Sequence, residues 1–495
     1  MSTLPVLVWL IPAVAGLALW LMPWSSRWVL SAARASAALQ LVVALQMFSA
    51  TAGGEILVHA FGGWGAPFGI VLAADRMSSL FALLLAILLL VTVWVLRPAA
   101  HGSLTVKRAL PLLFLLAFGL NGAFLTGDLF NLFVAFEVAL LASYLLIQVP
   151  GTDRSLGAGF PNVAINLLAS IFFFIGVGLL YGQHGTLNLG HLAHTIASGS
   201  PESLTTVACG LLAVAFGIKA GLVPLLFWLP ATYPTLSGPV AALFAGMMTK
   251  LGVFALLRTV PLLMQATPIP GLLVWLGVGS ALLGVLAALS EYEIRRLLGF
   301  HIVSQVGYMV LGLGLMTTSA IAAAIFYLTH HIVVKAILFF VADELERRSG
   351  TRDLRSMLPE RAQAGGLAAI FLLAAFSLAG IPPLSGFFAK VGLFRATLEA
   401  ESWWALGALA VASFFTLASM LKVWRLAFFA DRPANQPATS ALTPLWILAG
   451  ASVLLAIVAV PTYEFAEATA RQLLDVEAYS NAVLSGAGAK ESLAP

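Results

Sequence analysis

The chain has 495 residues, 61% of them hydrophobic and only 9% charged, with a formal net charge of +4. Soluble globular proteins carry about 25% charged residues, so this composition excludes an ordinary soluble protein and indicates an integral membrane protein. The 25 lysines and arginines are too scattered to indicate nucleic-acid binding. The single cysteine, Cys209, excludes an intrachain disulfide and a cysteine-based metal or redox cluster. We predict no metal site and no cofactor.

Fourteen segments are apolar and long enough to be membrane spans, which need about 20 residues each. The sequence begins with MSTLP, which lacks the basic residues of a signal peptide, so we expect the first apolar run to be a span. In chain order, the predicted spans are residues 4–22, 28–50, 76–96, 109–126, 129–148, 160–182, 204–229, 237–258, 271–289, 295–315, 319–344, 364–398, 403–429 and 444–463. The seventh and twelfth are too long, or too interrupted by proline, to be single straight helices.

Basic residues between the spans indicate which side of the membrane each loop faces. With the N-terminus outside, the inner loops hold fourteen basic residues and the outer loops five. The inner set is Arg27, Arg97, Lys107, Arg108, Arg154, Arg295, Arg296, Arg347, Arg348, Arg352, Arg355, Arg361, Arg425 and Arg432, and the outer set is Arg76, Arg258, Arg395, Arg471 and Lys490. We therefore predict a multi-pass protein of the cell (inner or plasma) membrane with both termini outside.

Six basic residues lie within the predicted spans. Arg34 and Lys422 are close enough to span ends for their side chains to reach the interface. Apolar sequence surrounds the other four on both sides, so this explanation fits them poorly; they are Lys219, Lys250, Lys335 and Lys390. Glu137 is the one carboxylate deep in a predicted span. Buried charges are paired, hydrated or neutralised, so we expect some of these lysines to face internal water or to lose and regain protons.

Two spans contain prolines that interrupt the helix. Pro224 interrupts the seventh span beside Lys219, and Pro382 and Pro383 interrupt the twelfth, two turns before Lys390. The two sites have similar sequences, KAGLVPL at 219–225 and LAGIPPL at 378–384. Each interrupted span is the fourth of a five-span block, spans 4–8 or spans 9–13. Paired broken helices indicate an internal repeat with ion sites at mid-membrane, although two kinked packing helices would give the same prolines.

The eleventh span carries the stretch YLTHHIVVKAILFF. Tyr327, His331 and Lys335 are spaced i, i+4, i+8 and therefore share one helix face, whereas His330 points about 100° away. Histidine titrates near neutral pH, so we interpret His331 with Lys335 as a proton relay. For His330, a relay role and a packing role both remain open. In the sixth span, polar residues recur at i, i+4 and either line a wet cavity or join helices by hydrogen bonds; they are Asn162, Asn166 and Ser170.

Five stretches together resemble a known family: TGDLFNLFVAFEVALLASYLLI, KAGLVPLLFWLPATYP, MMTKLGVFALLR, HHIVVKAILFF and GIPPLSGFFAKVGLF. They are similar to the antiporter-like membrane subunits that respiratory complex I shares with the multisubunit Mrp cation/proton antiporters. The resemblance covers nearly the whole chain, and the first stretch looks most like the D-type branch of the Mrp membrane subunits.

The resemblance implies an all-α protein of fourteen transmembrane helices with two inverted five-helix repeats, spans 4–8 and 9–13, each with one broken helix. The implied domains are residues 1–108, a first repeat at 109–258, a second repeat at 259–430, and a last span with a tail at 431–495. By motif, the family's functional positions fall on Glu137, Lys219, Lys250, His330 or His331, Lys335 and Lys390. Glu137 is expected to pair with Lys219.

The resemblance also implies that the chain is a subunit of a hetero-oligomeric antiporter complex and not an enzyme in itself. We predict proton translocation along these residues, with sodium bound elsewhere in the complex, because one carboxylate among four lysines is a poor cation site. Two alternatives remain at this point. One is a proton-pumping subunit of complex I or of a membrane-bound hydrogenase, and the other is a structural scaffold whose charges only join helices.

Overall fold

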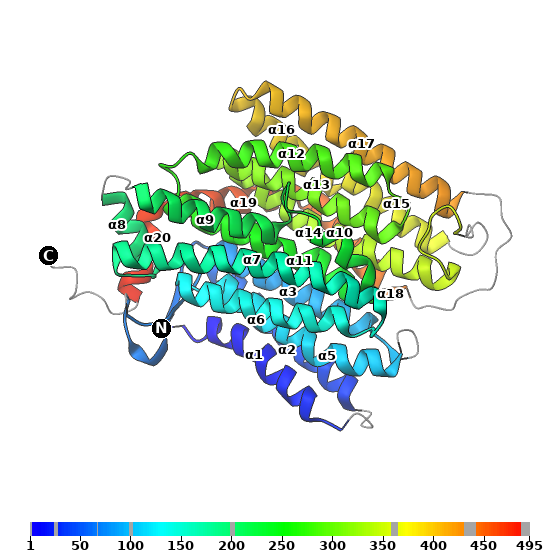
Figure 1. The fold of residues 1–495 in the computed structure, drawn as a ribbon, viewed down its shortest axis with the longest axis horizontal. Coiled ribbons are helices and arrows are strands. Elements are labelled where there is room, and N and C mark those ends of the chain that lie inside the picture. Colours follow the sequence, from blue (N-terminus) through cyan, green and yellow to red (C-terminus); the bar gives the residue numbers. More distant parts are fainter. Residues whose placement is uncertain are drawn as a thin grey trace.

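The computed structural model describes residues 2–23, 28–66, 68–98, 102–198, 203–357, 365–429 and 442–486. Within these ranges, twelve helices are long and apolar enough to cross a membrane, or up to thirteen spans if one bent pair counts as one. They are α1 (Leu4–Leu21), α2 (Trp28–Thr51), α3 (Arg76–Val95), α5 (Ser103–Leu125), α6 (Leu129–Gln148), α7 (Asp153–His184), α9 (Ser203–Ala220), α11 (Gly238–Leu263), α12 (Ile269–Ser290), α13 (Ile294–Gly314), α14 (Thr318–Ser349) and α17 (Trp403–Phe428). Most of them lie side by side with similar directions (Figure 1).

Shorter elements complete the described chain. The short helices are α8 (Leu189–Ser198), α10 (Trp228–Thr232), η2 (Tyr233–Thr235), α15 (Gly365–Ala379), α16 (Ser385–Glu399), α18 (Thr443–Ile457), α19 (Ala459–Leu474) and α20 (Val476–Gly486). Strands β1 (Leu57–Ala60) and β2 (Val71–Ala74) pair antiparallel, with Leu57 opposite Ala74, and flank the turn η1 (Phe61–Gly63). This hairpin, α8 and α20 lie at one end of the bundle, where α1 also begins (Figure 1). The sequence pattern predicted none of these three.

Helix starts differ from the predicted spans where local capping extends a helix beyond its apolar run. The span predicted at 160–182 begins at Asp153, because Thr152 and Ser155 form a reciprocal capping box. The Thr152 hydroxyl accepts from the Ser155 amide at 3.2 Å, and the Ser155 hydroxyl accepts from the Thr152 amide at 3.0 Å. Helix α5 also begins earlier than predicted, at Ser103 and not at residue 109, but without a side-chain cap, because its cap residue is Gly102.

The predicted span 444–463 is not one straight helix. Helix α18 ends at Ile457, α19 begins at Ala459, and the two axes differ by 78°. Pro461 explains the bend, because it has no amide hydrogen for the carbonyl of Ile457 and its ring clashes there.

The structure does not describe four of the basic residues on which the topology prediction depends. They are Arg27, Arg361, Arg432 and Lys490.

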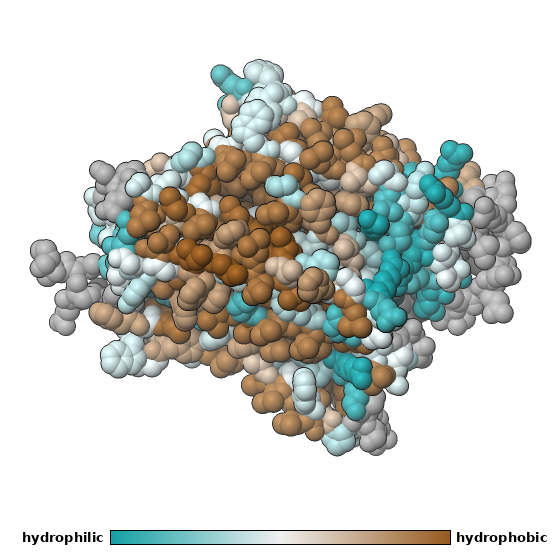
Figure 2. Space-filling view, in the orientation of Figure 1, coloured by the Kyte–Doolittle hydropathy of each residue, from teal (hydrophilic) through white to brown (hydrophobic). Residues whose placement is uncertain are grey.

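Helices α11 and α14 form the centre of the bundle. Their apolar windows are entirely buried, whereas those of α1, α2 and α17 are only one-third buried. Figure 1 shows α1 and α2 at one edge and α16 and α17 at the opposite edge. The face seen in Figure 2 is apolar over the middle of the bundle, and hydrophilic residues gather at one end. Exposed apolar side chains such as Trp20, Phe174 and Phe414 are those expected to face lipid.

A buried ion pair holds together four helices at the hairpin end. Arg258 of α11 donates to Asp75 through two hydrogen bonds of 2.6 and 2.9 Å, and both side chains are almost fully buried. Arg258 also donates to Ser78 of α3 at 3.1 Å and lies over the ring of Tyr479 of α20. The Ser78 hydroxyl donates to the Phe124 carbonyl of α5 at 2.5 Å. Burial by itself would raise the pKa of Asp75, but Arg258 and Ser78 hold it below its usual value, so the carboxylate is ionised at neutral pH.

The Asp75→Asn variant is expected to lower the free energy of unfolding by about 3–5 kcal/mol, because it leaves the Arg258 charge buried without its partner. A thermal unfolding scan of the purified protein in detergent measures this loss as a lower melting temperature. Adding Arg258→Met to Asp75→Asn removes the stranded charge and should restore part of the loss, whereas Asp153→Asn, at an exposed helix start, is the neutral control. Equal stability of Asp75→Asn and the parent would show that the pair does not hold the helices together.

Candidate functional site

The first helix break lies where the proline pattern predicts it. Helix α9 ends at Ala220, Gly221 adopts a left-handed φ of 77°, and α10 begins only at Trp228, so Pro224 lies in the non-helical link. A glycine just after a helix end accepts this conformation without strain. The Trp228 indole donates to the Ile218 carbonyl at 3.0 Å across the break. The break therefore leaves Lys219 in the last turn of a helix that ends inside the bundle.

Ser170 connects the predicted pair Glu137 and Lys219. The Lys219 ammonium, 3% exposed, donates to the Ser170 hydroxyl at 3.3 Å, and this hydroxyl donates to the Glu137 carboxylate at 2.5 Å. The Lys219 ammonium also lies 5.2 Å from the ring centre of Phe136. Glu137 itself is only half-buried. The Ser170 hydroxyl of α7 therefore bridges Glu137 and Lys219, and the described part of the structure shows no direct ion pair between them.

Lys250 lies in the enclosed middle of α11. Its side chain is fully buried, and its ammonium donates to the Ala245 carbonyl at 2.6 Å and to the Thr249 hydroxyl at 3.2 Å. Both contacts are within its own helix. Helices α9 and α11 can approach closely because Gly252 has no side chain. A Cβ at this position would lie only 2.4 Å from the Ala220 amide nitrogen. The end of the first broken helix therefore packs directly against the helix that carries Lys250.

The two histidines of α14 have different surroundings. The His330 ring accepts from or donates to the Ser385 hydroxyl at 2.9 Å, at the start of α16. His331 lies within electrostatic range of Lys250 and Lys335, and neither of its ring nitrogens has a hydrogen-bond partner among the described residues. Lys335 donates to the Leu298 carbonyl of α13 at 3.1 Å. All three side chains are at most 1% exposed, so the eleventh predicted span turns these groups inward.

The second helix break repeats the pattern of the first. Helix α15 ends at Ala379, Gly380 adopts a left-handed φ of 89°, and α16 begins at Ser385 after Pro382 and Pro383. Lys390 of α16 is 4% exposed and donates to the Ala379 carbonyl at 2.8 Å. The lysine therefore satisfies a carbonyl that the helix end leaves without an intrahelical partner.

Three polar residues of α13 belong to the same buried region, and the sequence interpretation missed them. His301, Gln305 and Tyr308 recur at i, i+4 and i+7 in an apolar helix, which is a signal that could have found them. His301 contacts the Ser419 hydroxyl of α17 at 2.9 Å. The Tyr308 ring stacks on Tyr327 and lies 5.4 Å from the Lys390 ammonium. Gln305 accepts a hydrogen bond from Tyr327. This polar face of α13 lies against the faces of α14 and α16 that carry the predicted groups.

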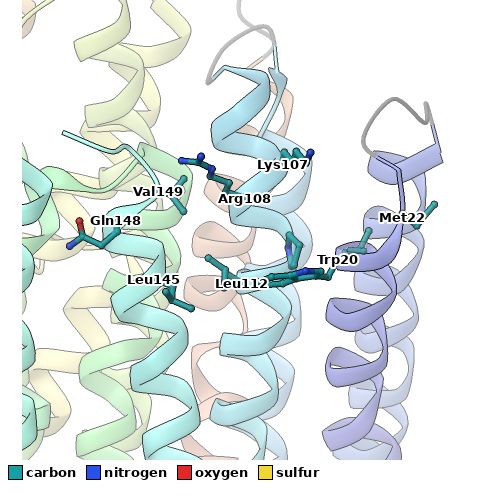
Figure 3. A pocket seen from close by; sticks show the side chains of 10 residues that line it. Trp20, Met22, Lys107, Arg108, Leu112, Leu145, Gln148 and Val149 are labelled. Carbon is teal, nitrogen blue, oxygen red and sulfur yellow. The ribbon is translucent and has the colours of Figure 1, made fainter.

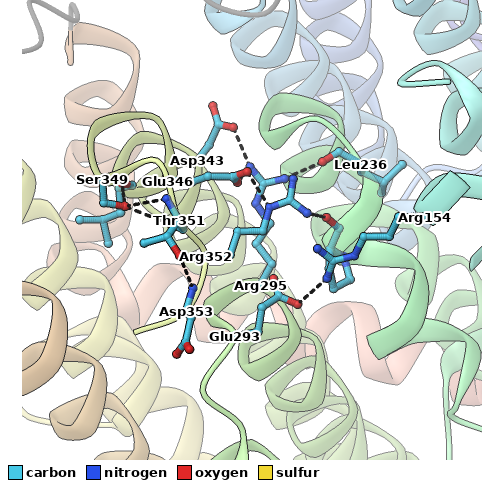
Figure 4. Close-up of polar contacts among 12 residues, drawn as sticks. Arg154, Leu236, Glu293, Arg295, Asp343, Glu346, Ser349, Thr351, Arg352 and Asp353 are labelled. Atoms are coloured by element: carbon cyan, nitrogen blue, oxygen red, sulfur yellow. Dashed lines mark hydrogen bonds and ion pairs between the residues drawn. The ribbon is translucent and has the colours of Figure 1, made fainter. Parts of the chain in front are cut away.

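Hydrophilic residues gather at the end of the bundle opposite the hairpin (Figures 1 and 2). A close-up shows Asp343, Glu346, Arg352 and Glu293 around Arg295 (Figure 4). Arg295 of α13, 2% exposed at its side chain, pairs with Asp343 at 2.8 Å and with Glu346 at 2.6 Å, both from α14. It also donates to the Leu236 carbonyl at 2.5 Å, in the link after the first break. A cavity of about 460 Å³ opens beside Arg295, Asp343 and Glu346. Asp343 is two helical turns from Lys335 on α14, so the cavity lies near the buried groups.

The remaining intramembrane cations have structural partners. Lys422 is half-buried and donates to three carbonyls at the end of α12, those of Ala288 at 3.3 Å, Leu289 at 2.7 Å and Glu291 at 2.6 Å. It therefore caps a helix end, which also explains a lysine near the end of a span. The Arg34 guanidinium lies 5.4 Å from the centre of the Trp94 ring. Within the described residues, no group of three or more His, Cys, Asp or Glu side chains could hold a metal ion.

Fold and site together define a polytopic α-helical membrane protein with a buried series of ionisable side chains between two broken helices. The family model for the NADH:quinone oxidoreductase/Mrp antiporter transmembrane proteins matches residues 126–416. The chain belongs to this family.

Two similar proteins are named as antiporter subunits. The chain is 40% identical to the D subunit of a Na⁺/H⁺ antiporter of Alkalihalophilus pseudofirmus, over 87% of this chain and 88% of the relative, and 35% identical to that of Bacillus subtilis, over 86% and 87%. Among solved structures, a chain of the Mrp complex from Dietzia sp. is 32% identical with a TM-score of 0.90, covering 98% of this chain and 100% of that one. A chain of respiratory complex I from Thermus thermophilus is 26% identical with a TM-score of 0.80, covering 95% and 99%.

Proposed function

We propose that this chain is the proton-translocating subunit, of the D type, of a multisubunit Na⁺/H⁺ antiporter in the cell membrane. The names of the relatives support the class of complex. One observation carries the role of the chain: four buried lysines and two buried histidines lie on the two broken helices and on the central helices α11 and α14. A bundle that needed only packing would gain nothing from these costly groups.

The proposed path runs from Glu137 through Lys219 and Lys250 to His331 with Lys335, and then to Lys390. Glu137 and Ser170 favour the charged form of Lys219, and separation of this contact would let Lys219 pass its proton onward. The unpartnered ring nitrogens of His331 call for water, because buried polar groups are normally hydrogen-bonded. His330 and Ser385 provide a second hydroxyl-linked route toward Lys390.

The cavity beside Arg295 and Asp343 is the proposed point at which protons reach this path from the inner side. Its carboxylates and arginines would keep water ordered at the mouth, and Asp343 and Lys335 lie on the same helix. The two helix breaks would supply polar backbone where water penetrates the bundle. We place sodium elsewhere in the complex, since Glu137 is the one carboxylate along the path, beside four lysines.

The proposed architecture has fourteen spans, with α15 plus α16 as the twelfth and α18 plus α19 as the last. Residues 109–258 and 259–430 would then be two inverted five-helix repeats between an N-terminal unit at 1–108 and a C-terminal unit at 431–495. The matching breaks at Gly221 and Gly380 support this division. Rotation about an axis in the membrane plane should superpose spans 4–8 on 9–13 in an experimental structure, and two blocks related by an axis along the membrane normal would contradict it.

Cysteine labelling tests the proposed outward orientation of both termini. In a Cys209→Ser background, Ser485→Cys near the C-terminus should react with an impermeant maleimide in intact cells. Ser356→Cys, after α14 at the opposite end, should react only after permeabilisation. The reverse labelling would invert the topology. The proposed architecture places three spans between the two sites. Labelling of both sites from one side would require an even number of spans and would contradict it.

Identification of the subunits that copurify with this chain tests the proposed class of complex. Affinity purification from native membranes should recover the other antiporter subunits, and deletion of the chain should abolish Na⁺-dependent dissipation of ΔpH in everted vesicles. Recovery of redox subunits instead would assign the chain to a respiratory proton pump, with the same path and a different driving partner. Normal exchange without the chain would leave it no transport role.

Ser170→Ala is expected to slow antiport at least tenfold, because it removes two hydrogen bonds to charged groups. Each such bond contributes about 1.5–3 kcal/mol, and about 1.4 kcal/mol already corresponds to a factor of ten in rate. Ser170→Thr keeps the hydroxyl and should retain most activity. Ser143→Ala removes another buried serine, whose hydroxyl donates only to the Leu140 carbonyl, and serves as the matched control. Initial rates of Na⁺-driven ΔpH change in vesicles measure the difference. Full activity of Ser170→Ala would mean that Glu137 and Lys219 interact without this hydroxyl.

A further inference from the structure

A cavity of about 450 Å³ lies between the end of α1, the second turn of α5 and the end of α6, away from the proposed proton path (Figure 3). Its walls are mostly apolar and include Trp20, Leu112 and Leu145. Trp20 and Leu145 are 67% and 51% exposed on the outer face of the bundle. Tryptophan is typical of the membrane–water boundary, so the cavity opens where a bilayer would change from acyl chains to headgroups.

Two cations stand at the mouth of this cavity without an acidic neighbour. Figure 3 shows Arg108 extending toward Val149 and Lys107 extending toward the α1 side. None of the side chains that line the cavity is acidic. Both cations are exposed, and among the described residues no carboxylate pairs with either of them. The local charge is therefore positive and uncompensated.

The helix that carries these cations increases the local positive charge. Lys107 and Arg108 lie in the second turn of α5, near the positive end of the helix dipole. The cap residue, Gly102, has no side chain that could accept a hydrogen bond from the first turn, and the first turn holds no acidic residue. Helix starts usually carry acidic or capping side chains that offset this dipole. An anion at the mouth of the cavity would supply the missing negative charge.

We propose that the cavity binds one anionic glycerophospholipid, with its phosphate between Lys107 and Arg108 and an acyl chain along Trp20, Leu112 and Leu145. The combination of an apolar wall and two cations at the membrane boundary matches an anionic headgroup and its chain. A helix from another subunit fits the space less well. A helix is about 10–12 Å across with its side chains, so a cavity of this volume holds only about one turn.

Lipid titration with native mass spectrometry tests the proposal on the purified intact complex. Phosphatidylglycerol and phosphatidylcholine are the two probes. Lys107→Gln with Arg108→Gln should weaken the tightest phosphatidylglycerol binding about tenfold or more and leave phosphatidylcholine binding unchanged. Arg296→Gln with Arg425→Gln removes the same charge at the same end of the bundle and should bind like the parent. Leu145→Trp fills the cavity, keeps both cations and should also lose the bound lipid.

Three outcomes would overturn the proposal. The first is equal phosphatidylglycerol binding by the parent and by both cavity variants. The second is equal loss in the control variant, which would assign the effect to overall charge. The third comes from a photoreactive residue in place of Trp20: a cross-link to another subunit, with no phospholipid captured, would show that a protein segment occupies the cavity.

Discussion

Glu137→Gln is expected to reduce Na⁺-dependent proton exchange by about 100-fold or more, which is the scale of a lost proton donor or acceptor, while the complex still assembles. Glutamine has the shape of glutamate and can still accept the Ser170 hydrogen bond, but it cannot hold a negative charge opposite Lys219. The lysine then loses the group that favours its charged form. Fluorescence measurements of ΔpH in everted vesicles, with added Na⁺, give the rate.

The control is Glu55→Gln, which removes an exposed carboxylate from the loop after α2 and should leave the rate unchanged. The amount of assembled complex is measured in parallel by native gel electrophoresis. Normal exchange by an assembled Glu137→Gln complex would remove this residue from the mechanism. Loss of assembly would favour the scaffold alternative, since stranding a buried charge destabilises a protein by about 3–5 kcal/mol.

Lys335→Ala is expected to reduce antiport by about 100-fold, far more than Val334→Ala at similar expression. Lys335 lies between Lys250 and the second break on the enclosed helix α14, and no neutral alkyl side chain can take its place in proton transfer. Val334 is equally buried on the same helix, and its truncation removes only about 1.5 kcal/mol of apolar burial. The comparison therefore separates loss of a titrating group from loss of packing.

Two further variants make the Lys335 result decisive. Lys335→Met fills nearly the same volume and removes a charge from the protein interior, so its melting temperature should not fall while its transport does. His331→Ala should change the shape of the pH–activity curve, because histidine is the side chain that ordinarily titrates near neutral pH. An unchanged curve in the His331→Ala, Lys335→Ala double variant would show that both side chains only pack.

The sequence by itself determined the features that depend on one helix at a time. Membrane insertion follows from the length and apolarity of each segment, and the helix breaks follow from Pro224 and Pro382, which cannot complete the hydrogen-bond ladder. The spacing of His331 and Lys335 fixed them on one face of α14. Pro461 carried a signal of the same kind for the bend after α18, and the span prediction overlooked it because the surrounding residues are apolar.

The tertiary structure alone decided which side chains meet. Ser170 of α7 lies between Glu137 of α6 and Lys219 of α9, and His330 reaches Ser385 of α16, while His331 lies within electrostatic range of Lys250 of α11. Asp75 and Arg258 pair across 183 positions of sequence. Such contacts depend on the rotation of each helix about its axis and on the angle at which it crosses its neighbours. The packing of the whole bundle sets both, so the local sequence of one helix does not contain them.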